Sequence, residues 1–267
     1  MPGIREVFHA HLVDYAYPRH CHDTWAILIV DDGAISFGLD RRERFAAGET
    51  VIILPPGVPH DGRPAPGAGG FRKREFYVDG TLLPDTLAGA AVDHTGISDI
   101  SLRAALARLH DRLARDGADP ALGAEAGISL IAERVAAHLA GLPRRPAPPS
   151  HGVARRLREF LDSRACDDVR LSEAAALLER SVPYLVRSFT REFGLSPYAY
   201  VLGRRIDTAR TLLLGGAAPA DVATAVGFYD QAHFTRHFKR HTSVTPAAYA
   251  RSHASAETPS QRRTGRV

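Results

Sequence analysis

The chain has 267 residues, of which 45% are hydrophobic and 24% are charged. This composition excludes a wholly disordered, collagen-like or disulfide-stabilised protein, and the length allows one or two domains. The two cysteines, Cys21 and Cys166, are typical of a reducing compartment. No apolar run reaches the roughly 18 residues that a membrane span needs, and the first residues lack the apolar core of a signal peptide. We therefore expect a cytoplasmic protein that does not contact a membrane.

The charge differs between the two halves of the chain. Residues 1–150 hold 16 Lys and Arg against 19 Asp and Glu, whereas residues 151–267 hold 18 against 11. The second half therefore has a net charge of +7, and the first half is mildly acidic. This asymmetry favours nucleic-acid binding by the second half, and a solvated surface of mixed charge is the plain alternative.

Residues 4–80 have the pattern of short strands separated by turns, and Asp31-Asp32-Gly33 is expected to end one of them. The strand-like segments are residues 25–30, 34–39, 41–45, 50–54 and 71–78. Their spacing predicts an antiparallel barrel or sandwich. We expect the basic run Arg72-Lys73-Arg74 to be a solvated strand edge, with binding of an acidic effector as the alternative.

Residues 98–140 predict two helices with apolar stripes. The first helix, over 98–116, is expected to be capped by Ser98 or Ser101, and the second runs from about 120 to 140. The two helices fit either an open end of the barrel or a second copy of the chain. The proline-rich segment 141–152 cannot continue a helix and predicts a linker.

An internal repeat follows the linker, with an offset of 49 residues. Ala174, Phe189, Arg191, Pro197 and Tyr200 recur as Ala223, Phe238, Arg240, Pro246 and Tyr249. Each copy predicts a short helix, a turn and a second helix. The expected start and stop signals are Ser172, Ser181 and Gly194 in the first copy, Pro219 and Asp230 in the second, and Ser196-Pro197 and Gly215-Gly216 around the long helix between them. Residues 153–165 predict one further helix, before the first copy.

Helical spacing sorts the second helix of each copy into an inward and an outward face. Leu185 and Phe189 share the inward face of the first, and Phe234 and Phe238 that of the second. The outward residues are Pro183, Val186, Arg187 and Thr190, then Gln231, Ala232, Thr235, Arg236 and Lys239. Arg, amide and hydroxyl groups read base edges in the major groove. The repeat and the positive charge favour DNA binding over a plain helical bundle.

Residues of about 153–251 resemble the DNA-binding domain of AraC/XylS-type transcriptional regulators, most clearly in GF-x-D-Q-x-HF-x-R-x-FKR and the later TP-x-x-Y. The resemblance implies two helix-turn-helix units in successive major grooves and a two-fold homodimer. It places at the base-facing positions Pro183, Val186, Arg187, Gln231, Ala232, Thr235 and Arg236. We expect phosphate contacts from Ser181, Thr190, Arg191, Lys239 and Arg240. The chain departs from the family at Thr242 and at Glu179-Arg180-Ser181, where a glycine is common.

The N-terminal half carries a second resemblance. His20 and His22 alternate along a predicted strand, and Pro55-Pro56-Gly57-Val58-Pro59-His60 forms a turn into a third histidine. This layout resembles cupin barrels and the sensing domain of AraC-type regulators. We expect an effector pocket lined by His20, His22, Trp25 and His60, with a filled core as the alternative.

Metal-binding cupins usually carry a Glu four residues after the second histidine, where this chain has Ala26. We therefore expect neither a metal nor another cofactor, although His20, His22 and His60 could still hold a divalent ion with an open site.

Together these features predict a mixed α and β protein with two domains. Residues 1–140 form a cupin-like antiparallel β-barrel with appended helices for effector binding and dimerisation, and residues 141–152 form the linker. Residues 153–251 form an all-α double helix-turn-helix domain, and residues 252–267 a disordered tail. The predicted function is a transcriptional regulator that binds double-stranded DNA sequence-specifically under the control of a small-molecule effector, with no catalytic residue. A metal-dependent cupin enzyme fused to a DNA-binding domain is the alternative.

Overall fold

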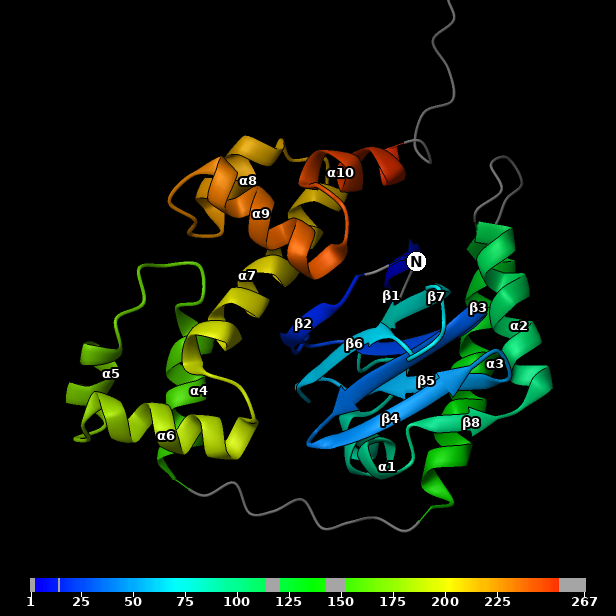
Figure 1. Ribbon diagram of the computed structural model, residues 1–267, viewed down its shortest axis with the longest axis horizontal. Helices are drawn as coiled ribbons and strands as arrows, with labels where there is room; N and C mark the ends of the chain where they lie inside the picture. The colour runs from blue at the N-terminus through cyan, green and yellow to red at the C-terminus, as the bar shows by residue number, and fades with distance from the viewer. Residues whose placement is uncertain (1–2, 14, 114–120, 143–151, 255–267) are drawn as a thin grey trace, which may run out of the picture.

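The computed structural model describes residues 3–13, 15–113, 121–142 and 152–254, and it divides into a β half and a helical half (Figure 1). Most of the predicted linker, residues 143–151, and most of the predicted tail, residues 255–267, lie outside the described residues.

The β half contains eight described strands, and all of their pairings are antiparallel. The strands are β1 (Ile4–Leu12), β2 (Tyr17–His20), β3 (Trp25–Leu39), β4 (Arg42–Ala47), β5 (Thr50–Leu54), β6 (His60–Pro64), β7 (Phe71–Val78) and β8 (Gly96–Ser98). The main path runs β1-β7-β3-β5-β8, while β4 and β6 pair with β3, and β2 pairs with β6. The predicted antiparallel β architecture is therefore confirmed.

Strand β3 is longer than the sequence indicated. The expectation that Asp31-Asp32-Gly33 ends a strand was wrong, because β3 continues through it to Leu39. Its first part pairs with β5 and β7 and its last part with β4 and β6. Gly33 has φ 75°, and a Cβ there would lie 2.1 Å from the Gly70 carbonyl oxygen. A glycine therefore lets this strand turn from one side of the barrel to the other.

The basic run in β7 does not lie at a strand edge, because β7 pairs with both β1 and β3. Lys73 is buried, and its Nζ lies 2.6 Å from Glu75 Oε2. Arg74 pairs with Asp31 and Asp111. The expected solvated edge is thus wrong, because two neighbouring strands cover β7.

Helices cover the barrel on the side away from the helical half (Figure 1). They are η1 (Asp85–Leu87), α1 (Ala88–Asp93), α2 (Ile100–Leu113) and α3 (Ala121–Ala140). One apolar cluster joins Trp25, Ile27 and Phe76 to Leu102 and Ile131. The cap of α2 is the Asp99 carboxylate, which accepts from the Leu102 N–H at 2.9 Å, and not Ser98 or Ser101.

The helical half contains seven described helices. They are α4 (Val153–Ser163), α5 (Leu171–Leu177), α6 (Val182–Phe193), α7 (Pro197–Leu214), α8 (Pro219–Ala225), α9 (Gln231–Thr242) and α10 (Pro246–Ala254). Two apolar clusters divide it, one holding Leu185 and Phe189 and the other Phe234 and Phe238. Because α7 contributes residues to both clusters, it joins the two helix-turn-helix units.

The predicted helix starts have mixed outcomes. Ser196 caps α7 through the Ala199 N–H, and Asp230 caps α9 through the His233 N–H, as expected. The Ser172 prediction was wrong, because α5 begins one residue earlier. Ser181 precedes α6 as expected, but its side chain makes no capping hydrogen bond.

The repeat places equivalent residues in left-handed backbone. Gly194 ends α6 with φ 70°, and Ser243, 49 residues later, ends α9 with φ 69°. The missing glycine of the second copy is therefore at Ser243 and not at Thr242, which is helical and buried. Glu179 has φ 52° in the turn after α5, where the sequence analysis noted the lack of a glycine.

Replacing Glu179 with glycine should stabilise the protein. A left-handed non-glycine residue costs about 1–2 kcal/mol, and the extra freedom of glycine in the unfolded chain offsets about 0.5–1 kcal/mol. We expect Glu179→Gly to raise the free energy of unfolding by about 1 kcal/mol, measured by thermal unfolding. Glu179→Ala is the matched control, because it keeps the Cβ and should give no gain.

Candidate functional site

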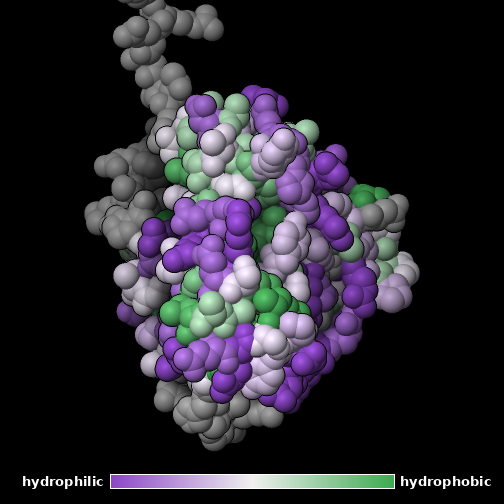
Figure 2. Space-filling model, turned by 90° about the vertical axis from the view of Figure 1, so that its left-hand side faces the viewer, coloured by the Kyte–Doolittle hydropathy of each residue, from purple (hydrophilic) through white to green (hydrophobic). Residues whose placement is uncertain are grey.

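The first candidate site is the outward surface of α6 and α9. The structure places Pro183, Arg187, Gln231, Ala232 and Arg236 in exposed positions, and Val186 and Thr235 are half-buried. The residues predicted to contact phosphate are also exposed: Ser181, Thr190, Arg191, Lys239 and Arg240. Figure 2 shows the side of the molecule where α5, α6 and α8 lie, with hydrophilic bands separated by apolar patches.

Barrel side chains contact the C-terminal ends of both of these helices. Arg19 Nε donates to the Gly194 carbonyl at 3.2 Å, and Arg41 donates to the Arg191 carbonyl, both at the end of α6. The Tyr15 hydroxyl donates to the Lys239 carbonyl at 2.6 Å, in the last turn of α9. The last carbonyls of a helix lack partners within the helix and favour donors and cations. The barrel therefore holds the end of each of the two helices.

The second candidate site is a cavity between the barrel and the helical half. The barrel supplies an apolar floor: Phe8, Leu28, Ile35, Phe37, Ile52 and Leu54. Polar barrel residues at the cavity are Tyr17, His20, His60, Asp61, Lys73 and Glu75. The facing wall consists of Gly203, Ile206, Asp207 and Arg210 of α7, with His241 and Thr242 of α9. Residues from both halves of the chain thus enclose one space.

The three predicted histidines come together: His20 and His60 line the cavity, and His22 contacts both of their rings without lining it. The ring centroids of His20 and His60 are 4.5 Å apart, and those of His22 and His60 are 4.7 Å apart. His22 lies beyond the end of β2, yet its ring faces His20 as expected, while Cys21 packs with Leu157 in the helical half.

Burial holds the pKa of His20, His22 and His60 well below the usual value for histidine. Each Nδ1 lies at hydrogen-bond distance from a backbone carbonyl. The pairs are His20–Pro18 at 2.7 Å, His22–Thr24 at 2.7 Å and His60–Val58 at 2.9 Å. The rings are therefore neutral.

Trp25 does not line the cavity. It is fully buried in the cluster between the barrel and helices α2 and α3. Side chains alternate along β3, so Trp25 and Ile27 face the helices while Leu28 faces the cavity. Alternation along this strand was an available signal that Trp25 faces the helices and not the cavity.

Several cavity residues were not predicted from the sequence, among them Tyr17, Glu75, Arg210 and His241. Lys73 and Glu75 are two residues apart on one strand, so they share a face, and this spacing was an available signal. Arg210 and His241 lie in the other half of the chain, and only the docking of the two halves brings them to the barrel.

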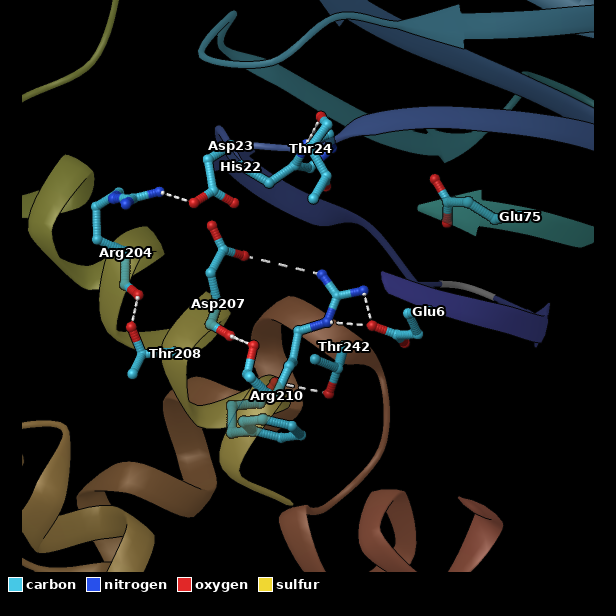
Figure 3. Close-up of polar contacts among 12 residues, drawn as sticks. Glu6, His22, Asp23, Thr24, Glu75, Arg204, Asp207, Thr208, Arg210 and Thr242 are labelled. Carbon is cyan, nitrogen blue, oxygen red and sulfur yellow. Dashed lines mark hydrogen bonds and ion pairs between the residues drawn. The ribbon is translucent and has the colours of Figure 1, made fainter. Parts of the chain in front are cut away.

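An ionic network connects α7 to the barrel (Figure 3). Arg210 Nε lies 2.9 Å from Glu6 Oε2 of β1, and Arg204 Nη1 lies 2.9 Å from Asp23 Oδ2. Asp207 lies between these pairs, with Oδ1 3.9 Å from Arg210 Nη1. Burial, with a smaller contribution from the Asp23 charge, raises the pKa of Asp207 to about 7.

Two classes of site lack support in the described parts of the chain. No group of three or more His, Cys, Asp or Glu residues there has the arrangement to hold a metal ion. None of the helices there is long and apolar enough to cross a membrane.

Comparisons with known proteins agree with this arrangement. The family model for the AraC-like ligand binding domain matches residues 3–131, and a helix-turn-helix domain model matches residues 174–252. The uncharacterized HTH-type transcriptional regulator YbfI of Bacillus subtilis is 25% identical over 229 residues, which cover 81% of each chain. The virulence regulon transcriptional activator VirF of Yersinia enterocolitica is 31% identical over 93 residues, 34% of each chain.

The fold also matches a solved structure. ToxT of Vibrio cholerae aligns over 92% of this chain and 96% of its own, with a TM-score of 0.61 and 11% identity. At that identity the likeness shows a shared two-domain fold. The two family models together cover more than half of the sequence, in the order ligand-binding domain, then helix-turn-helix domain. The chain therefore belongs to the AraC-type family of DNA-binding transcriptional regulators, with an N-terminal ligand-binding domain.

Proposed function

We propose that this protein is a sequence-specific regulator whose binding to double-stranded DNA is controlled by a small-molecule effector in the cavity between its two halves. In this proposal residues 1–140 are the effector-binding and dimerisation domain, residues 141–152 the linker and residues 153–251 the DNA-binding domain. The observation that supports effector control most directly is that side chains of both halves line the same cavity. A molecule bound there contacts both halves at once.

The mechanism follows from what such a ligand stabilises. A ligand shifts an equilibrium only by its difference in affinity for the two states. A molecule that contacts both His60 of the barrel and Ile206 of α7 favours the docked arrangement of the halves. Docking also places Arg19, Arg41 and Tyr15 against the ends of α6 and α9. The effector therefore acts on the positions of the two helices that would enter DNA.

The effector's general nature is supported by the cavity and by a relative of the same fold. The barrel floor is apolar, and a structure of ToxT contains a bound unsaturated fatty acid. We infer a small molecule with an apolar body. In this proposal the protein is not an enzyme, because ligand binding and domain rearrangement need no catalytic residue. We also propose that it acts in the cytoplasm.

Arg187 and Arg236 should determine base preference. They occupy equivalent exposed positions of the repeat, and a guanidinium that binds guanine O6 and N7 provides about 1–3 kcal/mol of discrimination. We expect Arg187→Ala and Arg236→Ala each to relax preference at a different base position, the two positions being about 10 base pairs apart. Binding measured over a library of site variants tests this, and it tests DNA binding itself.

Lys239→Ala is the matched control for these two variants. Lys239 lies further along α9, where a phosphate contact is expected. Its loss should weaken binding to all sequences equally and lower the salt slope by about one. If both Arg→Ala variants also lose affinity evenly over every sequence, the base-reading assignment is wrong.

Dimerisation is proposed for the groove between α2 and α3. Leu102, Leu109, Leu130 and Ile131 line this groove, and Leu130 is 67% exposed. Burying such a surface against a second copy removes apolar area from water. We expect Leu130→Arg to weaken dimerisation of the full chain by about tenfold or more, since about 1.4 kcal/mol corresponds to tenfold. Sedimentation measures this, and Leu177→Arg, at an exposed leucine of α5, should leave the dimer intact. A wild-type chain that sediments as a monomer contradicts the proposal.

Asp207 should make stability depend on pH. Its pKa is raised in the folded protein to about 7, so its stabilising effect is present at low pH and is lost as pH rises through 7. Asn mimics the protonated form, so the stability of Asp207→Asn relative to wild type should increase between pH 5 and pH 8, by up to about 2–3 kcal/mol. Thermal unfolding across this range tests it. A constant difference between Asp207→Asn and wild type over this pH range contradicts the prediction.

A further inference from the structure

We propose that the cavity binds an uncharged molecule with an apolar body and a hydroxyl group, and that this hydroxyl donates to the bare Nε2 atom of His60 in the histidine cluster formed by His20, His22, His60 and His241. This inference rests on the proposed function, because it assigns a chemical class to the ligand of the same cavity. The hydrogen bonds of the rings, the charges at the cavity and its apolar floor support this proposal.

The hydrogen-bonding roles of the four rings are fixed by their Nδ1 partners. His241 Nδ1 lies 2.8 Å from the His237 carbonyl oxygen, and the other three rings have the backbone carbonyl partners given above. A carbonyl oxygen only accepts, so each Nδ1 carries the proton. Burial also lowers the pKa of His241, which keeps that ring neutral like the others. Each Nε2 is therefore a bare acceptor.

These acceptors lie close together, and the one on His22 lacks a donor. The ring centroids of neighbouring members are between 4.5 and 6.2 Å apart. His22 Nε2 is buried and has no hydrogen-bond partner. The Tyr17 hydroxyl is likewise buried with no hydrogen-bond partner, and this burial raises its pKa. Because a buried acceptor without a donor is costly, a ligand that supplies a donor gains affinity here.

The charges at the cavity exclude a ligand that brings its own negative charge. Its two cations already pair with protein carboxylates, Lys73 with Glu75 at 2.6 Å and Arg210 with Glu6 at 2.9 Å. The carboxylates at the cavity are Asp61, Glu75 and Asp207. A bound carboxylate would lose its water without meeting a free cation.

The rest of the cavity defines the body of the ligand. The floor side chains Leu28, Phe37 and Ile52 are apolar, and they belong to one buried cluster of the barrel. The described residues show no group arranged to hold a metal ion. An apolar body on this floor with its hydroxyl at the ring nitrogens matches both the apolar and the hydrogen-bonding parts of the lining.

Three probes of similar shape separate the possibilities: benzyl alcohol, benzoate and toluene. Binding to the full chain is measured by calorimetry near neutral pH, with a chelator present. We expect benzyl alcohol to bind about tenfold more tightly than either of the others, because sites built to bind a hydroxyl reject analogues that lack it. Benzoate that binds as tightly as the alcohol overturns the proposal, as does an alcohol affinity that appears only when Zn²⁺ replaces the chelator.

A variant locates the effect at the histidine cluster. His60→Phe keeps an aromatic ring but removes an acceptor, so it should reduce the affinity for benzyl alcohol to that for toluene and leave toluene binding unchanged. If this buried variant does not fold, the comparison of the three probes on the wild-type chain decides the proposal by itself. Failure of all three probes to bind at millimolar concentration also overturns it. The proposed regulatory function is tested separately. It fails if the base-library measurement shows no sequence-specific DNA binding, and that measurement needs no ligand.

Discussion

The buried ion pair between Arg210 of α7 and Glu6 of β1 is the interaction on which the arrangement of the two halves depends. The two side chains are 13% and 5% exposed, and the guanidinium also lies over the Tyr77 ring at 4.1 Å. Separating the two side chains while one of them stays buried leaves that charge unpaired, at a cost of about 3–5 kcal/mol. The halves therefore either stay docked with the pair intact or separate far enough for water to reach both groups.

Helix α7 connects this ion pair to the packing of the DNA-binding half. It belongs to the apolar clusters of both helix-turn-helix units, and the same helix presents Ile206, Asp207 and Arg210 to the barrel. The barrel holds α6 and α9 at their C-terminal ends as well. Helices α6 and α9 are thus each held by packing on α7 and by a barrel side chain. Both kinds of contact are kept or lost together. A change in the barrel residues that contact α7 therefore acts on both α6 and α9.

Much of this organisation was predictable from local sequence. Apolar spacing and capping residues such as Ser196 and Asp230 locate most helices, because these signals depend on neighbours within one turn. The strands were less well placed, since Gly33 looks like a strand end and becomes a turn within β3 only because Gly70 packs against it. The candidate site was only half predictable. His20, His22 and His60 lie in a recognisable pattern, but Arg210 and His241 reach the cavity only when the halves dock, which no local pattern encodes.

In the proposed function, the histidine cluster and the ion pair together set the direction of effector control. The ion pair makes docking nearly all-or-none, whereas His22 Nε2 is a buried acceptor without a partner inside the docked form. A ligand that donates to the cluster also meets His241 of α9, which lies beside His20 of the barrel only in the docked form. Its binding energy is therefore added to the docked state and not to the separated one, which is the condition for a ligand to shift a conformational equilibrium. The ligand-bound protein is consequently the form in which the barrel fixes the spacing of α6 and α9.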